Sequence, residues 1–217
     1  MIIDTPEFLR ARFFMRDESL EGVDDLPRVA PKQVHASSII HVTDENFGDY
    51  VLPSCPEADG VLLTTTRAGA SLRFADCAPV LLWGEGWVMI LHSGYKGTVL
   101  GIAGEGLELV RGLYGDEAVR GAHAWVGPCI GRGEYCREVE DEWTQRGLKS
   151  FAPENYDIRG GKVYFDLAGE IMDRHTSASG RLLTSISRSS TRMAAPLSMS
   201  SAARLTPSLK PGAFPAI

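Results

Sequence analysis

Two short apolar segments separated by a glycine-rich triplet constrain the fold of this 217-residue chain more than any other feature. Pro79 to Trp83 and Trp87 to His92 each have the length and composition of a β-strand. Gly84-Glu85-Gly86 between them is typical of a tight turn that joins two antiparallel strands. The sequence therefore predicts a β-hairpin over residues 79–92.

This hairpin brings a thiol and an imidazole close together in two of its three registers. A turn closed at Gly84-Glu85 places Cys77 opposite His92, and a turn closed at Glu85-Gly86 makes them diagonal neighbours on one face. A three-residue loop would place them on opposite faces. In the first two registers their Cβ atoms lie roughly 4.5–8 Å apart. That distance suits either one metal ion bound by both side chains or a thiolate–imidazolium pair. A third interpretation is that Cys77 is a buried cysteine that only contributes to packing.

The rest of the chain predicts a mixed α/β (α+β) fold. Strands first cluster and then alternate with helices, which is typical of a single domain with mixed β-sheets flanked by helices. We expect further strands at residues 34–42, 60–65, 70–74, 122–126 and 163–165, and helices beginning near residue 5 and at 98–114, 134–147 and 166–175.

The composition changes sharply after His175. Residues 176–217 contain ten serines, five basic residues and no acid, whereas residues 1–175 carry 17 basic residues, all 28 acids and a net charge of −11. The later segment shows neither helical nor strand periodicity. We therefore expect a domain over residues 1–175 and a poorly packed tail over 176–217 that contributes no residue to a functional site.

Charge and hydropathy exclude several classes of protein. The net charge of −6 is unlike that of a nucleic-acid-binding domain, which usually has a basic face. The apolar runs are too short to cross a bilayer, and the first ten residues lack the apolar core of a secretory signal. We expect a cytoplasmic protein whose four cysteines are thiols or metal ligands, with small-molecule partners and neither nucleic acid nor membrane.

Five short motifs occur in an order that resembles the laccase-domain family, also called the polyphenol oxidase or multicopper-oxidase-like family. The resemblance runs from about Lys32 to Ile171, roughly two-thirds of the chain. The order of five motifs is much more specific than any one of them. They are Lys32-Gln33-Val34-His35, Glu57-Ala58-Asp59-Gly60, Ala75-Asp76-Cys77-Ala78-Pro79-Val80, His92-Ser93-Gly94-Tyr95-Lys96-Gly97-Thr98 and Gly127-Pro128-Cys129-Ile130-Gly131.

The resemblance implies a metal site and an activity. Family members are described as purine nucleoside phosphorylases with adenosine deaminase activity, and residue by residue their zinc ligands correspond to His35, Cys77 and His92. Zinc is the expected cofactor, with copper as the alternative. The expected partners are therefore a nucleoside and phosphate, and the expected fold is that of the laccase-domain and cysteine-hydrolase-like proteins.

Other residues are candidates for roles around this site. Asp76, beside Cys77, is the first candidate for a catalytic acid or base, and Asp59 is the second. Lys96 or Arg73 would hold phosphate, and Tyr95 is expected to contact the substrate. Tyr95 stands where the family has tryptophan, which keeps an aromatic ring at this position. Lys96 stands where the family has arginine, which keeps the positive charge but loses the two parallel hydrogen bonds that a guanidinium can donate to phosphate or carboxylate. The family's C-terminal motifs do not occur after residue 175.

Three other functions compete with a zinc enzyme. In a cysteine hydrolase or a peptidoglycan-editing enzyme, Cys77 would be the nucleophile and His92 the base. A zinc-binding domain without catalysis is the second alternative. The third, a true multicopper oxidase, is disfavoured because the whole chain has only five histidines.

Overall fold

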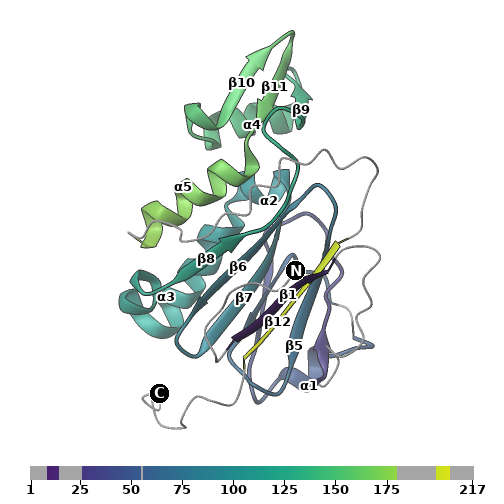
Figure 1. Cartoon of the computed structure of the whole chain (residues 1–217), viewed down its shortest axis with the longest axis vertical. Helices are drawn as coiled ribbons and strands as arrows, with labels where there is room; N and C mark the ends of the chain where they lie inside the picture. The colour runs from purple at the N-terminus through teal and green to yellow at the C-terminus, as the bar shows by residue number, and fades with distance from the viewer. Residues whose placement is uncertain (1–8, 15–25, 55, 180–198, 206–217) are drawn as a thin grey trace.

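The computed structural model describes residues 9–14, 26–54, 56–179 and 199–205, and these form two β-sheets packed face to face with a layer of helices outside one of them (Figure 1). One apolar cluster fills the space between the sheets, and a second lies between the five-stranded sheet and the helices. The mixed α/β class expected from the sequence is confirmed.

The predicted hairpin forms the middle of the five-stranded sheet. It consists of β6 (Ala78–Gly84) and β7 (Trp87–Ser93), and every residue of both strands is buried. Alternate side chains point to opposite layers, so that Leu81 belongs to the cluster between the sheets and Leu82 to the cluster under the helices. The strand order is β3 (Ile39–Val42), β4 (Gly60–Leu63), β7, β6 and β8 (His123–Val126).

The second sheet has four strands and joins segments that are far apart in the chain. Its order is β1 (Leu9–Phe14), β12 (Met199–Leu205), β5 (Gly69–Phe74) and β2 (Arg28–Val29). Strand β12 is antiparallel to both β1 and β5, with Ala203 opposite Ala11 on one side and Ala70 on the other. It is therefore an inner strand of this sheet.

Helices cover the outer face of the five-stranded sheet. The helical segments are α1 (Phe47–Tyr50), α2 (Tyr95–Leu100), α3 (Ile102–Arg120), α4 (Glu142–Ser150), the 3-10 turn η1 (Pro153–Asn155) and α5 (Leu167–Ser179). Of these, α2, α3 and α5 contact the five-stranded sheet, whereas α1 packs against the cluster between the two sheets. Gly101, with φ of 79°, ends α2 and begins α3. Gly106 lets α3 approach the sheet, because a Cβ there would lie 2.5 Å from the sulfur of Met89. A glycine at this position therefore allows the helix to pack closely on the sheet.

A small three-stranded sheet stands at one end of the molecule, above α2 and next to α4 (Figure 1). It contains β9 (Cys136–Glu138), β10 (Tyr156–Arg159) and β11 (Lys162–Phe165), with β11 in the middle. An aromatic cluster that includes Tyr95, Phe151 and Phe165 joins this sheet to α2 and α4.

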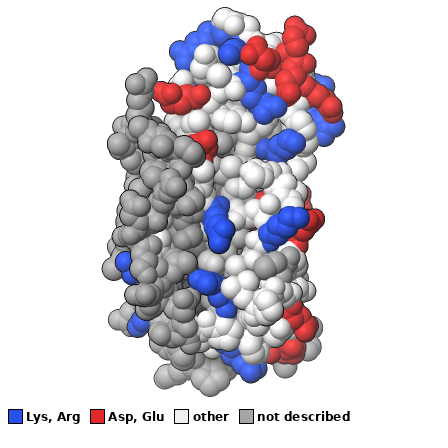
Figure 2. Space-filling view, turned by 90° about the vertical axis from the view of Figure 1, so that its right-hand side faces the viewer, with Lys and Arg blue, Asp and Glu red and all other residues white. Residues whose placement is uncertain are grey.

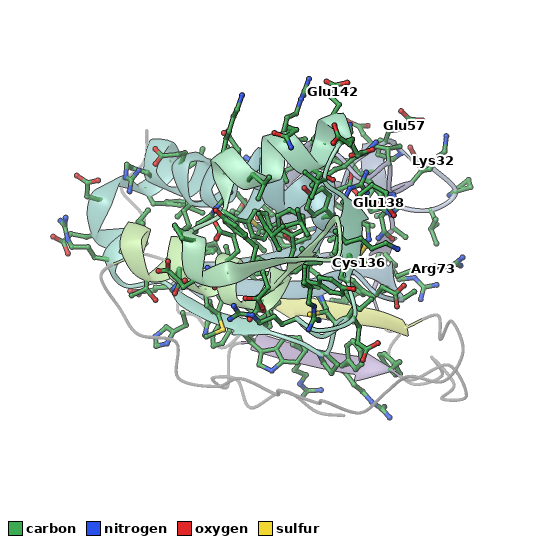
Figure 3. All side chains as sticks on the ribbon, turned by 90° about the horizontal axis from the view of Figure 1, so that it is seen from above. Lys32, Glu57, Arg73, Cys136, Glu138 and Glu142 are labelled. Carbon is green, nitrogen blue, oxygen red and sulfur yellow. The ribbon has the colours of Figure 1, made fainter. Side chains whose placement is uncertain are left out.

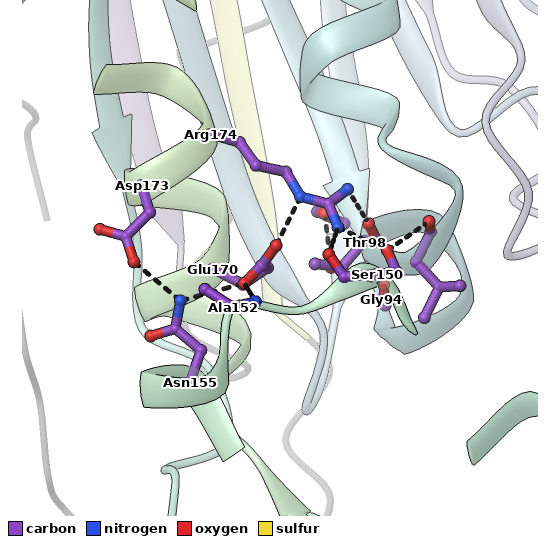
Figure 4. A network of polar contacts seen from close by, with 10 residues as sticks. Gly94, Thr98, Ser150, Ala152, Asn155, Glu170, Asp173 and Arg174 are labelled. Atoms are coloured by element: carbon purple, nitrogen blue, oxygen red, sulfur yellow. Dashed lines mark hydrogen bonds and ion pairs between the residues drawn. The ribbon is translucent and has the colours of Figure 1, made fainter. Parts of the chain in front are cut away.

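A buried polar network fixes α2 against α5 (Figure 4). The guanidinium of Arg174 donates to the carbonyl of Thr98 at 2.6 Å and to that of Ser150 at 2.8 Å, and its Nε pairs with Glu170. The Glu170 carboxylate, 3% exposed as a residue, also accepts from Asn155. Arg174 of α5 thus connects the end of α2 with the end of α4.

Two expected elements are wrong, for local reasons. Residues 34–38 do not extend β3, because the backbone N–H groups of Val34, His35 and Ala36 donate to the side chain of Asp59 instead of to a strand. The helix expected at 134–147 begins only at Glu142, where Asp141 caps it, and β9 precedes it.

At both ends of the chain, the described residues form strands where the sequence analysis did not expect them. The helix expected from residue 5 is not found in the described part, since residues 9–14 form β1, and residues 1–8 lie outside the described residues. The expectation that the segment after residue 175 packs poorly is wrong for Met199–Leu205, because β12 pairs on both sides. Helix α5 continues to Ser179, across the expected boundary. The division into a domain and a tail stays a prediction.

The described surface carries charges of both signs. On the face shown in Figure 2, basic and acidic side chains are interspersed, and many of the acids gather at the end that carries the small sheet. Within the described residues, no helix combines the length and apolar content needed to cross a membrane.

The position of β12 generates a test by truncation. A chain ending at residue 198 leaves β1 and β5 without their shared neighbour, and we expect this to remove most of the roughly 5–15 kcal/mol that stabilises a domain. Circular dichroism and urea unfolding should therefore show a largely unfolded protein. A chain ending at residue 205 keeps the strand and is the control. Equal stability of the two truncated chains would contradict an integral β12.

Candidate metal centre

Three side chains from separate segments meet at one end of the hairpin. His35 lies in the loop before β3, Cys77 directly precedes β6, and His92 is near the end of β7. Their ligand atoms all lie within 4.8 Å of one another, so one ion could contact all three after small side-chain rotations. Two imidazoles and a thiol are a donor set that suits zinc or copper.

The register of the hairpin explains why Cys77 and His92 meet. Gly84 pairs with Trp87 and Pro79 with His92, so the turn closes at Glu85-Gly86. Cys77 is consequently a diagonal neighbour of His92, which is the second of the three registers considered. The strands β4 and β8 flank this hairpin and hold the register on both sides.

The centre is buried on one side and open on the other. His92 is 3% exposed, Cys77 is partly buried and His35 is exposed. The rings of His35 and His92 meet edge to face with centroids 4.8 Å apart. A ligand from solvent would therefore approach from the side of His35.

Asp59 organises two of the three ligands. Its carboxylate is fully buried and accepts the backbone N–H groups of His35 at 3.0 Å and Ala36 at 2.7 Å, together with a longer contact from Val34 at 3.3 Å. The same carboxylate lies 2.8 Å from Nδ1 of His92. When Nδ1 donates to Asp59, Nε2 of His92 is left as the electron-pair donor for a metal.

The loop that carries His35 has an unusual backbone. His35 has φ of 58°, in the left-handed region that residues other than glycine rarely adopt. The hydrogen bonds to Asp59 offset this cost. A second anchor is Gln33, whose side-chain amide donates to the carbonyl of Arg73 and whose side-chain oxygen accepts the Arg73 N–H. The loop is thereby fixed to β5 as well.

Gly94 leaves room for the thiol. A Cβ at this position would lie 2.7 Å from Sγ of Cys77 and 3.4 Å from Cδ2 of His35. The backbone of Gly94 is extended and also caps α2, so the requirement for glycine comes from the approach of the ligands rather than from its dihedral angles.

The electrostatics favour a neutral pair in the absence of a cation. Burial raises the pKa of Cys77 to about 11, and the carboxylates of Asp76 and Asp59 add to the effect. Burial also lowers the pKa of His92, although its hydrogen bond with Asp59 acts in the opposite direction. A thiolate–imidazolium pair is therefore not stabilised by this environment, whereas a bound cation would stabilise the thiolate.

The remaining predicted site residues lie in different surroundings. Asp76 is exposed beside Cys77, and its backbone carbonyl accepts from Ile130. Arg73 lies at the outer edge of the molecule, on the same side as the Lys32–Glu57 ion pair (Figure 3). The ammonium of Lys96 lies 4.9 Å from the ring centroid of Trp143.

Tyr95 differs most from its expected role. It is 5% exposed, packs in the aromatic cluster under the small sheet, and donates its hydroxyl to the carbonyl of Trp143 at 2.8 Å. Little of its surface is left for contact with a substrate. Sequence reasoning considered Asp59 only as a candidate catalytic acid or base, and it did not identify the hydrogen bonds through which Asp59 positions His35 and His92.

Comparison with known proteins gives one family and several relatives. A family model described as "Multi-copper polyphenol oxidoreductase laccase" matches residues 11–189. A purine nucleoside phosphorylase of Aquifex aeolicus is 28% identical over 144 residues, which are 66% of this chain and 62% of that protein. The purine nucleoside phosphorylase YlmD of Geobacillus stearothermophilus is 31% identical over 134 residues, covering 58% of this chain and 47% of its own length. The matches span less than two-thirds of these relatives.

Solved structures share the fold. The hypothetical protein YfiH of Bacillus licheniformis matches with a TM-score of 0.72 and 19% identity, covering 91% of this chain and 93% of its own. YlmD of Geobacillus stearothermophilus matches with a TM-score of 0.69 and 19% identity, covering 93% and 94% of the two chains.

The Asp59 contacts predict the effect of Asp59→Asn. An amide cannot accept all four hydrogen bonds, so buried N–H groups lose their partner, at about 1–3 kcal/mol for each unsatisfied group. We expect a lower melting temperature and a 10- to 100-fold loss of zinc affinity, measured by competition with a chromogenic chelator. Asp76→Asn, an exposed carboxylate at the same site, is the control for both measurements. Unchanged zinc affinity in Asp59→Asn would contradict the positioning role.

Gly94→Ala tests the steric requirement separately. The methyl group should displace the thiol of Cys77 and lower zinc occupancy at least tenfold, while circular dichroism stays that of the parent. Gly112→Ala is the matched control, because nothing lies within 4 Å of a Cβ there and the helix should gain up to about 1 kcal/mol. Full zinc occupancy in Gly94→Ala, by elemental analysis, would show that the thiol does not need this space.

Proposed function

The chain belongs to the multi-copper polyphenol oxidoreductase laccase family, and on this premise we propose that it is a zinc-dependent enzyme that acts on purine nucleosides. The observation that carries the proposal is the convergence of His35, Cys77 and His92 on one point, with Asp59 behind them. The relatives named purine nucleoside phosphorylase suggest the substrate class.

The histidines argue against copper oxidase chemistry despite the family's name. The chain has five histidines, and only two of them belong to the metal centre. His41 bonds to Thr64, His123 stacks on Trp83, and His175 is buried at α5. A cluster of several copper ions needs more imidazoles than one centre with two histidines supplies.

A zinc ion with three protein ligands would supply a Lewis acid with one open position. His92 would be held in a single tautomer by Asp59, and the exposed position of His35 would leave the open side to substrate. Asp76 is proposed to move the proton, because it is the exposed carboxylate beside Cys77. Asp59 is less suited to that role, since its oxygens already accept four hydrogen bonds.

Two reactions fit this arrangement. In phosphorolysis, a phosphate oxygen bonds to C1′ of the ribose, the bond from C1′ to the purine nitrogen breaks, and the base leaves with a proton. In deamination of adenosine, the oxygen of water replaces the amino group at C6 and ammonia leaves. Phosphate would be held by Lys96 or Arg73, both of which are exposed.

The alternatives are less well supported by the same geometry. A cysteine hydrolase, including one that edits peptidoglycan, needs a reactive thiolate at Cys77, and burial raises the pKa of that thiol. A zinc-binding domain without catalysis would share the ligands, and only a product assay separates it from an enzyme.

The experiment measures metal and products on the same samples. We expect about one zinc per chain, and release of adenine or of inosine and hypoxanthine from adenosine and phosphate, followed by liquid chromatography. Cys77→Ser should lose the zinc and all products, whereas Cys136→Ser, whose residue lies on β9, should keep both. If the metal-free protein is fully active and iodoacetamide abolishes that activity, the result would instead support the cysteine hydrolase hypothesis. Zinc without any product would favour the non-catalytic domain.

A further inference from the structure

The loop between β8 and β9 leads from the metal centre to a second tyrosine. Its residue Ile130 donates its N–H to the carbonyl of Asp76, the neighbour of Cys77, at 2.9 Å. The chain then turns, because the N–H of Tyr135 donates to the carbonyl of Gly131 at 3.3 Å. A single turn of backbone therefore separates Tyr135 from the segment that carries the metal ligand.

The small sheet directs Tyr135 and Arg137 to the same side. The N–H of Phe165 donates to the carbonyl of Tyr135 at 3.1 Å, which continues the register that places Val163 opposite Arg137. Alternate residues of a strand share one face, so Tyr135 and Arg137 project together with the buried Val163 and Phe165. On this side the ring centroid of Tyr135 lies 5.4 Å from that of Tyr95. Tyr135 thus lies beside the first residue of α2, the helix that begins at the metal centre.

Arg137 holds the hydroxyl of this tyrosine from one side. Its Nη1 donates to the Tyr135 hydroxyl at 3.4 Å, and its Nη2 lies 2.7 Å from the carboxylate of Asp141. The guanidinium also lies over the ring of Tyr95, with its central carbon 4.9 Å from the ring centroid. A planar guanidinium donates in fixed directions, so these contacts limit the orientations that the Tyr135 hydroxyl can adopt.

The two tyrosines differ in where their hydroxyl protons go. Tyr95 donates to the carbonyl of Trp143 at 2.8 Å. The Tyr135 hydroxyl accepts from Arg137, and a guanidinium has no acceptor, so the proton of Tyr135 must be donated elsewhere. Among the residues that the structure describes, no group accepts this proton. Because Tyr135 is only partly buried, a ligand from solvent can accept it.

The electrostatics place this phenol in the surroundings of the metal centre. Burial raises the pKa of Tyr135, the guanidinium of Arg137 lowers it, and the charge of a Cys77 thiolate adds to the rise. The last contribution requires that the phenol and the thiol lie near each other. Since the net change is upward, Tyr135 keeps its proton at neutral pH and is a hydrogen-bond donor without charge.

We propose that Tyr135 is a substrate-contact residue, whose hydroxyl, oriented by Arg137, donates a hydrogen bond to an oxyanion bound at the open side of the metal centre. In phosphorolysis this anion is phosphate, so its identity rests on the proposed function. Arg137 is a positioning residue that acts through Tyr135. The hydroxyl adds a donor beside the metal to the contribution of Lys96, whose ammonium covers the ring of Trp143.

The test measures binding of inorganic phosphate to the zinc-loaded full-length protein by isothermal titration calorimetry, without any nucleoside. Tyr135→Phe removes a hydrogen bond to a charged ligand, and we expect the dissociation constant for phosphate to rise about tenfold or more. Zinc content and melting temperature should stay those of the parent, because the ring keeps its place in the aromatic cluster. Tyr164→Phe, on the opposite face of the small sheet, is the matched control and should bind phosphate as the parent does.

Arg137→Met tests the positioning role, because it keeps the aliphatic part of the side chain and removes both hydrogen bonds. We expect a lower melting temperature and a smaller rise in the dissociation constant for phosphate than in Tyr135→Phe. Combined with Tyr135→Phe, the same substitution should cause no further rise, since coupled residues are not additive. An equal rise in both backgrounds would show that Arg137 contacts the anion itself, and would overturn its role through Tyr135.

The outcomes separate this proposal from the proposed function. Equal phosphate affinity in Tyr135→Phe and the parent, or no phosphate binding by the zinc-loaded parent, would overturn the contact whatever the product assay gives. Weaker phosphate binding in Tyr135→Phe, without any product from adenosine in the parent, would support the contact and contradict the nucleoside activity.

Discussion

The candidate metal centre depends on one buried carboxylate. Asp59 stands at the start of β4, where its backbone carbonyl accepts the N–H of His92 at 2.7 Å while its side chain accepts the Nδ1 proton of the same residue. The other contacts of this carboxylate fold the loop around His35 into its left-handed turn. A buried charge is tolerated only when hydrogen bonds replace its hydration, and here those bonds are the ones that shape the site.

The hairpin supplies the rigid part of the centre. Because β6 and β7 are covered on both faces, their strands consist almost wholly of apolar residues, and polar chemistry can occur only where they end. Cys77 and His92 lie at that end, and Gly94 follows directly. Helix α2, which begins after Gly94, is held at its far end by the Arg174 network. Only His92 therefore lies within a packed strand, Cys77 directly precedes one, and His35 is contributed by a loop.

Local sequence predicted the elements whose signals are local. The hairpin follows from two apolar runs around glycine, and the cap of α5 follows from Asp166, which accepts the N–H of Gly169. The register of the hairpin was left open among three alternatives, because it is settled by pairing with β4 and β8 rather than by the turn. Strand β12 could not be foreseen from its own sequence, because it is defined by backbone pairing with β1 and β5, two segments that lie far from it along the chain.

The site residues also differ in whether local sequence could place them or whether contacts between distant segments were needed. His35, Cys77 and His92 come from three segments, and the resemblance to a family named them where spacing alone left them ambiguous. Tyr95 and Lys96 show the limit of that reasoning, because adjacent residues at the start of a helix point in different directions. Tyr95 enters the aromatic cluster and Lys96 covers an indole ring at the surface. A motif therefore identifies which residue of this chain corresponds to a family residue. The role of that residue depends on which side of helix α2 it lies on and what it contacts there.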